Sequence, residues 1–247
     1  MNYSSQTLPP VETPNTDSIF VWIDILGFSK DLEIRNNYGM LKHTLSEFRN
    51  IFKMAFAHQA LISDGILLEI PYEYHQWNPN KITEIFREIA DNQLSFILKH
   101  KKVVRGGIAT GNPISEVDYD NRIYVSDGLV RAYRIESIVC SWPIIGITQD
   151  EVSKIIDYSK STNEDFGLKI TYNASGKKIY FLNFINSLLV NSGTEYTASV
   201  LKQLIEEKLE QNNSTDDRTR AKYFWILKYL KATLGTNIPE KYKEHIL

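Results

Sequence analysis

The sequence predicts an α+β fold, in which a mainly antiparallel sheet is flanked by helices and followed by a C-terminal helical appendage. Short apolar runs rich in β-branched and aromatic residues, such as SIFVWIDILGF, alternate with longer segments whose apolar residues recur at helical spacing. After residue 190 the pattern is purely helical. The order β-α-β-β-α-β-α-β-α-β-β before that point indicates helices covering a mainly antiparallel sheet.

The first half of the chain supplies the first of these elements. Residues 18–28 are expected to form a buried strand, and apolar positions at helical spacing predict a helix over about 38–56. ALISDGILLEI, residues 60–70, is typical of two short strands around a Ser-Asp-Gly turn. A second amphipathic helix follows, with Asn80 as its expected cap.

The second half continues the alternation. KVVRGGIATG is expected to be a strand, VSDGLVRAYRIES a helix capped by Ser126 or Asp127, and WPIIGIT a short strand. QDEVSKIIDYSK is expected to be a helix, GLKITYNASGKKIYFLNF a hairpin, and SVLKQLIEEKLEQ and RAKYFWILKYLKATL the terminal helices. We therefore expect a flexible tail over residues 1–17, a main domain over 18–188 and the helical appendage over 189–247.

Composition excludes several classes of protein. The net charge of -2 lacks the basic excess of a nucleic-acid-binding surface. The single cysteine, Cys140, excludes an internal disulfide and a cysteine-rich zinc site. No apolar run approaches the ~20 residues that span a bilayer, and the first residues lack the features of a signal peptide. We expect a cytoplasmic protein that binds neither nucleic acid nor membrane.

Two aspartates stand in apolar surroundings. Asp24 ends a predicted strand within WIDIL, and Asp64 lies at a predicted hairpin turn within LISDGIL. A carboxylate in such a place is costly unless it is hydrogen-bonded or binds a cation. Two carboxylates on adjacent strands, completed by phosphate oxygens, form a common Mg²⁺ site. The alternative is structural: Asp64 as a turn residue and Asp24 as a helix cap.

Two further stretches suit phosphate binding. If a helix begins after Asp24, its free N–H groups would face a triphosphate, with Gly27 permitting close backbone approach. Arg131 and Arg134 lie three apart, so both can occupy one face of the helix after RGGIATG. One of them could contact a phosphate bidentately, although a solvated arginine face is equally consistent with the spacing.

These motifs, taken in order, resemble a known family. The stretch DILGF, then Ser63-Asp64, then RGGIATG, then a helix ending in Arg-Ile-Glu is similar to the class III nucleotidyl cyclase catalytic domain, over roughly residues 17–185. IDILGF and the LVRAY helix most resemble the bacterial Pycsar anti-phage cyclases, which make cyclic pyrimidine nucleotides. RAKYFWILKYL is similar to the helical tail of that group.

The resemblance implies a ferredoxin-like cyclase fold and two-metal catalysis. It places two divalent ions, Mg²⁺ or Mn²⁺, at Asp24, Asp64 and Ile25, and places the nucleoside triphosphate at Leu26, Gly27 and Phe28. Arg134, or in the other register Arg131, would stabilise the developing phosphate charge. Because this family takes metal aspartates and arginine from different subunits, the resemblance implies a head-to-tail homodimer. A separate downstream effector would respond to the cyclic nucleotide in anti-phage defence.

Departures from the family pattern bear on the base. Ala60 and Ile123 stand where adenylyl cyclases carry the lysine and aspartate that read adenine, and neither side chain can hydrogen-bond a purine edge. A pyrimidine substrate fits these positions, with UTP the first choice over CTP. Val130 replaces the family's asparagine, and NASGKK does not match its lysine-glycine hairpin. A catalytically silent nucleotide- or partner-binding module and a purine cyclase remain the alternatives.

Overall fold

A seven-stranded sheet forms the centre of the computed structural model, which describes residues 16–28, 38–113, 126–162, 165–173, 175–185, 194–211 and 217–234. The strands are β1 (Ser18–Ile25), β2 (His58–Ile62), β3 (Gly65–Ile70), β4 (Val104–Gly111), β5 (Ile145–Thr148), β6 (Lys169–Tyr172) and β7 (Lys178–Phe181). Their order is β2-β3-β1-β4-β5-β7-β6, and only the β4–β5 pair is parallel. The predicted α+β fold with a mainly antiparallel sheet is confirmed.

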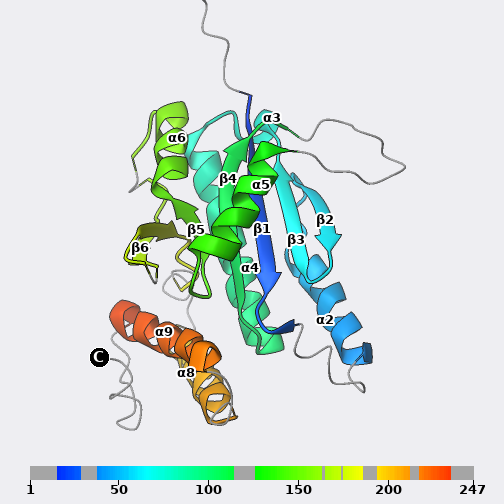
Figure 1. The fold of residues 1–247 in the computed structure, drawn as a ribbon, viewed down its shortest axis with the longest axis vertical. Coiled ribbons are helices and arrows are strands. Elements are labelled where there is room, and N and C mark those ends of the chain that lie inside the picture. The colour runs from blue at the N-terminus through cyan, green and yellow to red at the C-terminus, as the bar shows by residue number, and fades with distance from the viewer. Residues whose placement is uncertain are drawn as a thin grey trace, which may run out of the picture.

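Helices cover both faces of this sheet (Figure 1). They are α2 (Tyr38–Ile51), α3 (Tyr72–His75), α4 (Pro79–His100), α5 (Asp127–Arg134), the π-helical turn η1 (Ile135–Val139), α6 (Gln149–Ser159), α8 (Thr194–Gln211) and α9 (Asp217–Leu234). Helices α2, α4 and α6 contribute to the main hydrophobic core on one face, whereas α5 and η1 cover a smaller cluster on the other. We call this second side the α5 face.

Strand β1 divides its side chains between the two faces, as an alternating strand must. Ile19, Val21 and Ile23 point into the main core, whereas Phe20 and Trp22 pack in the smaller cluster. Asp24 follows in the same alternation, which places its side chain on the α5 face.

Gly107 allows α5 and η1 to lie close to the sheet. A Cβ atom on Gly107 would lie 2.2 Å from the carbonyl oxygen of Ala132 and 2.8 Å from the backbone nitrogen of Glu136. Any other residue would therefore push this helical segment away from β4. This close approach explains part of the glycine pair in RGGIATG.

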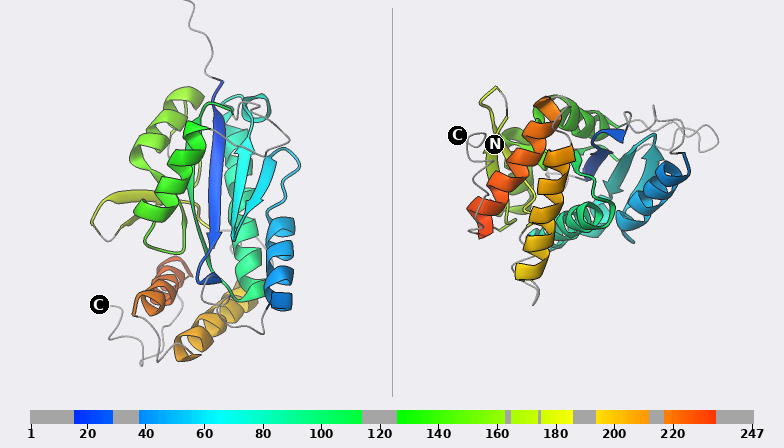
Figure 2. Two further views of the ribbon diagram at one scale, coloured as in Figure 1. Left: turned by 45° about the vertical axis from the view of Figure 1, so that its right-hand side comes forward. Right: turned by 90° about the horizontal axis from the view of Figure 1, so that it is seen from below.

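The C-terminal helices lie at one end of the sheet (Figure 2). Leu201 and Ile205 of α8 and Ile226 and Leu230 of α9 are buried in the same core cluster as the sheet. The two helices therefore share the core of the main domain. The boundary expected at residues 188–189 and most of the expected tail over 1–17 lie outside the described residues.

Several details differ from the sequence predictions. Asn78, not Asn80, caps α4: its side chain accepts hydrogen bonds from the backbone N–H groups of Asn80 and Lys81, because Pro79 occupies the first helical turn. The helix predicted over 38–56 ends at residue 51. Ser126 caps α5, as one of the two expected residues. Within the described ranges no helix is both long and apolar enough to cross a membrane.

Candidate functional site

Asp24 and Asp64 are brought together at one end of the β1–β3 pair. Asp24 lies opposite Gly65 in the antiparallel register, so Asp64 is the next residue of the turn. The backbone N–H of Ile25 donates to the carbonyl oxygen of Asp64 at 3.3 Å, which ties the turn to the end of β1. The Asp24 side chain is 22% exposed. The adjacency expected from the sequence is thus present in the fold.

Arg105 and Glu136 complete the cluster, and neither was predicted from the sequence to have a role. Arg105 lies opposite Asp24 on β4, and its guanidinium is 4.0 Å from the Asp24 carboxylate. Its Nε forms an ion pair with Glu136, whose side chain is 3% exposed. The π-helical turn that begins at Ile135 carries Glu136, and such turns are frequent at functional sites. A signal existed: Arg105, like Asp24, is a charge inside an apolar strand.

We call Asp24, Asp64, Glu136 and Arg105 the carboxylate cluster. It holds three carboxylates and one guanidinium. Burial, together with the charges of Asp64 and Glu136, raises the pKa of Asp24 to about 7, although Arg105 acts in the opposite direction. Burial also raises the pKa of Glu136, and the positive charges of Arg105 and of Lys222 on α9 partly offset this. The cluster therefore carries more negative charge than its protein partners compensate.

A divalent cation could compensate this excess of negative charge. Carboxylate oxygens are the ligands that Mg²⁺ and Mn²⁺ prefer, and Mg²⁺ usually takes one or two carboxylates with water and substrate phosphates. Among the described residues no group of three or more His, Cys, Asp or Glu side chains is arranged as a metal site. Asp24 and Asp64 would therefore share an ion with ligands from outside the protein.

The segment after Asp24 differs from the expectation of free N–H groups. The N–H groups of Ile25 and Leu26 donate to the carbonyl oxygens of Asp64 and Val103, so neither is available to a phosphate. The Phe28 side chain is buried in the main core. Gly27 is exposed with a φ of +81°, a conformation that favours glycine and leaves its backbone open to a ligand.

The two positions expected to face the base are placed unequally. Ala60 is half-buried on β2, opposite Leu67 of β3, and packs against the smaller cluster on the α5 face. Its side chain thus lies on the same face as Asp24. Ile123 lies outside the described residues.

The two candidate arginines have different surroundings. Arg131 forms ion pairs with Asp127 at 2.9 Å and with Glu151 at 3.2 Å, and it donates to the carbonyl oxygen of Thr110. Arg134 is exposed, and no carboxylate of the described segments pairs with it. Arg131 is thus held in place by the fold, whereas Arg134 is available to a ligand or a partner.

Arg131 is also distant from the carboxylate cluster. Its anchor, Thr110, lies five residues along β4 from Arg105, a separation of about 17 Å in an antiparallel strand. Within one chain the structure pairs neither candidate arginine with Asp24 or Asp64.

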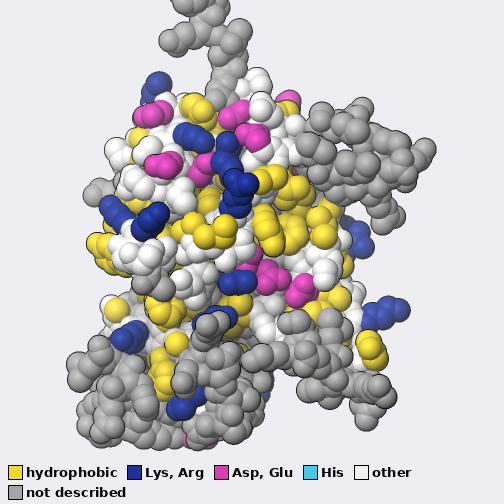
Figure 3. All heavy atoms as spheres, in the orientation of Figure 1, with side chains coloured by type: hydrophobic (Ala, Val, Ile, Leu, Met, Phe, Trp, Pro, Cys, Tyr) yellow, Lys and Arg dark blue, Asp and Glu magenta, His cyan; other side chains and the backbone are white. Residues whose placement is uncertain are grey.

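The α5 face carries an exposed apolar patch with charged side chains on both sides of it (Figure 3). Exposed apolar side chains on α5 and β2 include Leu61, Ile62, Val130 and Tyr133, each at least 39% exposed. The Tyr133 ring packs edge-on against Trp22, with 5.7 Å between the ring centroids. Figure 3 shows basic and acidic side chains mixed over α5 on one side of the patch, and acidic side chains beside a basic group toward the end of β1 on the other.

Comparisons with known proteins add little to this description. No family model matches the chain, and no curated protein matches it. Among solved structures it is similar to the adenylyl cyclase CyaB from P. aeruginosa, with a TM-score of 0.49 and 14% identity, over 68% of this chain and 94% of that chain. A similarity of this extent does not assign the activity or the substrate of that protein to this chain.

Proposed function

We propose that this chain is a nucleotidyl cyclase that converts a nucleoside triphosphate into its 3′,5′-cyclic monophosphate and pyrophosphate. The proposal rests on one observation: Asp24 and Asp64 lie together in a cluster whose negative charge is greater than the positive charge of the neighbouring residues. The order of motifs that resembles class III cyclases is independent support. A structural role for the aspartates accounts less well for a half-buried Asp24 whose pKa is raised by burial and by the charges of Asp64 and Glu136.

In the proposed reaction the ribose 3′-oxygen attacks the α-phosphorus, and pyrophosphate leaves. Divalent ions held by Asp24 and Asp64 would supply positive charge to the 3′-hydroxyl and the triphosphate. The protein's own work is positioning and charge stabilisation. Arg105 fixes the orientation of Asp24 and Glu136, and Gly27 lets the substrate approach the backbone.

We propose further that two copies pair head-to-tail through the α5 face. Exposed apolar side chains of α5 and β2 form a patch that a second copy could cover (Figure 3). A two-fold axis through the patch would bury these side chains of both copies against each other. Such pairing would supply the carboxylate cluster with the partner's Arg134, which no carboxylate of the described residues holds in its own chain.

UTP is the proposed substrate, with CTP second. Ala60 offers no hydrogen bond to a base, so a site that reads purine edges through this position is absent. The resemblance to the Pycsar cyclases supports a pyrimidine and a role as a signal in anti-phage defence, acting through a separate effector.

The direct test is to incubate the purified protein with ATP, GTP, CTP or UTP, with Mg²⁺ or Mn²⁺, and to identify products by mass spectrometry. A cyclic monophosphate from UTP is the expected result. Asp64→Asn should abolish it, whereas Asp157→Asn, which alters an exposed aspartate on α6, should not. A purine product would overturn the base assignment. No product from any nucleotide would favour the silent binding module.

The composite site has its own test. Asp64→Asn and Arg134→Ala proteins should each be inactive, and mixing them should restore activity, because mixed dimers contain one intact site. Random exchange of subunits gives about a quarter of the wild-type sites. Mixtures that stay inactive although the subunits exchange would contradict the head-to-tail arrangement.

A further inference from the structure

A pocket lies between α9 and the β6–β7 hairpin. Its volume is about 530 Å³, within the range of small-molecule sites. In the sheet order β6 lies four strand spacings from β1, which is about 19 Å. None of the lining residues is Asp24 or Asp64, although the aromatic rings of the pocket join the smaller hydrophobic cluster of the α5 face.

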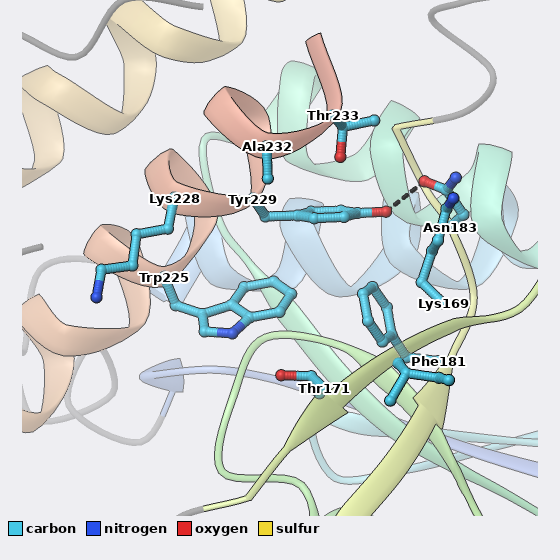
Figure 4. A pocket seen from close by; sticks show the side chains of 10 residues that line it. Lys169, Thr171, Phe181, Asn183, Trp225, Lys228, Tyr229, Ala232 and Thr233 are labelled. Carbon is cyan, nitrogen blue, oxygen red and sulfur yellow. Dashed lines mark hydrogen bonds between the residues drawn. The ribbon is translucent and has the colours of Figure 1, made fainter. Parts of the chain in front are cut away.

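Three aromatic rings form its apolar wall (Figure 4). The ring centroids of Phe181 and Trp225 are 5.6 Å apart, those of Phe181 and Tyr229 are 5.2 Å apart, and those of Trp225 and Tyr229 are 5.3 Å apart. Phe181 is buried, while Trp225 and Tyr229 are half-buried. The wall is therefore rigid where it joins the core, and it presents aromatic surface to a planar ligand.

Polar groups at the pocket are fixed by the fold. The Tyr229 hydroxyl donates to Oδ1 of Asn183, which orients the Asn183 amide. Burial raises the pKa of Tyr229, so this hydroxyl remains a donor. Because Oδ1 is the acceptor in that bond, the amide nitrogen remains as a donor, and within the described residues no protein group accepts from it. Thr171 adds a hydroxyl from β6.

Two lysines complete the lining, one from each wall. Lys169 comes from β6 and Lys228 from α9, and Figure 4 shows them at opposite sides of the aromatic rings. Both side chains are exposed, and neither forms an ion pair with any residue in the described ranges. A pocket with an aromatic wall, oriented donors and two uncompensated cations has the chemistry of a site for an aromatic anion.

We propose that this pocket binds a mononucleotide, with the base against Phe181, Trp225 and Tyr229 and the phosphate contacted by Lys169 or Lys228. A base offers a planar ring to the aromatic wall, as in single-strand binding proteins, where bases stack on aromatic side chains. The site is additional to the cyclase site, because none of its lining residues belongs to the carboxylate cluster.

Isothermal titration calorimetry of the full chain in EDTA tests the proposal with three probes: uridine 5′-monophosphate, uridine and inorganic phosphate. EDTA removes divalent ions, so binding at the aspartates does not contribute. The monophosphate should bind about tenfold more tightly than either fragment, because only it engages both walls. Phosphate that binds as tightly as the monophosphate would overturn the assignment, since the aromatic wall would then contribute nothing.

A pair of matched variants locates the site. Lys169→Ala with Lys228→Ala should weaken binding of the monophosphate about tenfold. Lys178→Ala with Lys231→Ala removes two exposed lysines from the neighbouring strand β7 and from α9 that do not line the pocket, and should leave binding unchanged. Equal affinity in both variants, or no binding to the wild type, would overturn the proposal. Both calorimetric results are independent of cyclase activity, because neither measures turnover.

Discussion

Glu151 and Asp24 are carboxylates near opposite ends of β4, and their partners differ. Glu151 accepts hydrogen bonds from the backbone N–H and the hydroxyl of Thr110, both at 2.9 Å, and pairs with Arg131 and Lys154. Asp24 has a single guanidinium at 4.0 Å and two other carboxylates nearby.

The difference distinguishes a fully paired carboxylate from a poorly paired one. A buried charge that the fold uses only for stability is paired and hydrogen-bonded, as Glu151 is. A buried charge whose protein partners compensate it poorly costs stability and is expected at a site completed by a ligand. Strand β4 thus contacts a well-paired carboxylate at one end and the candidate site at the other.

The largest expected effect is on activity. Asp24→Asn should lower cyclase turnover by about a thousandfold or more, because it removes a metal-binding charge. Product formation measured by mass spectrometry, with circular dichroism as a check on the fold, tests this. Asp157→Asn is the control. Turnover near the wild-type level in the Asp24 variant would place the site elsewhere.

The next effect is on stability. Glu151→Gln should lower the free energy of unfolding by about 2 kcal/mol, because it removes the buried carboxylate charge that pairs with the partly exposed Arg131 and Lys154. Urea unfolding monitored by fluorescence measures the change. If this variant kept its stability and lost its turnover, Glu151 would be needed for the reaction and not for stability, contrary to the comparison.

The pH dependence of stability sharpens the same comparison. In the metal-free protein the folded-state pKa of Asp24 is raised to about 7. The folded state therefore binds the proton more tightly than the unfolded state does, and stability falls as pH rises from the unfolded pKa to about 7. Relative to Asp24→Asn, the wild type should lose about 2 kcal/mol between about pH 4 and pH 7, after allowance for partial exposure. If the free energy of unfolding changed equally with pH in the two proteins, this prediction would be contradicted.

The smallest effect separates the two arginines. Arg131→Ala should cost about 1 kcal/mol of stability, since its ion pairs are partly exposed. Arg134→Ala should leave the unfolding free energy unchanged and lower turnover. Thermal unfolding and turnover of both variants decide between them. Loss of turnover only in the Arg131 variant would assign that arginine to the reaction.

Local patterns in the sequence account for much of the fold. Alternating and helical periodicities predicted the strands and the long helices, because each reports directly on a buried face. The cap of α4 was misplaced by two residues, since Asn78 and Asn80 both suit a cap and Pro79 distinguishes them only through its preference for the first helical turn. The short helix α3 was not anticipated, because four residues give no periodicity.

The site was predicted in part, for physical reasons. Asp24 and Asp64 were identified because each charge interrupts an apolar run. Arg105 and Glu136 were not assigned to the cluster, because their pairing depends on the β1–β4 register and on the π-helical turn, which arise from contacts between distant segments. The use of the Ile25 and Leu26 N–H groups within the sheet likewise depends on neighbouring strands.

The most direct measurement is the change in unfolding free energy that Mn²⁺ produces in the wild type and in Asp24→Asn. If the cluster is under-compensated because a cation completes it, saturating Mn²⁺ should stabilise the wild type by about 2–3 kcal/mol at a hundredfold excess over its dissociation constant. The Asp24 variant should show little stabilisation. Equal stabilisation of both proteins, or none of the wild type, would contradict the assignment of Asp24 and Asp64 as a cation site.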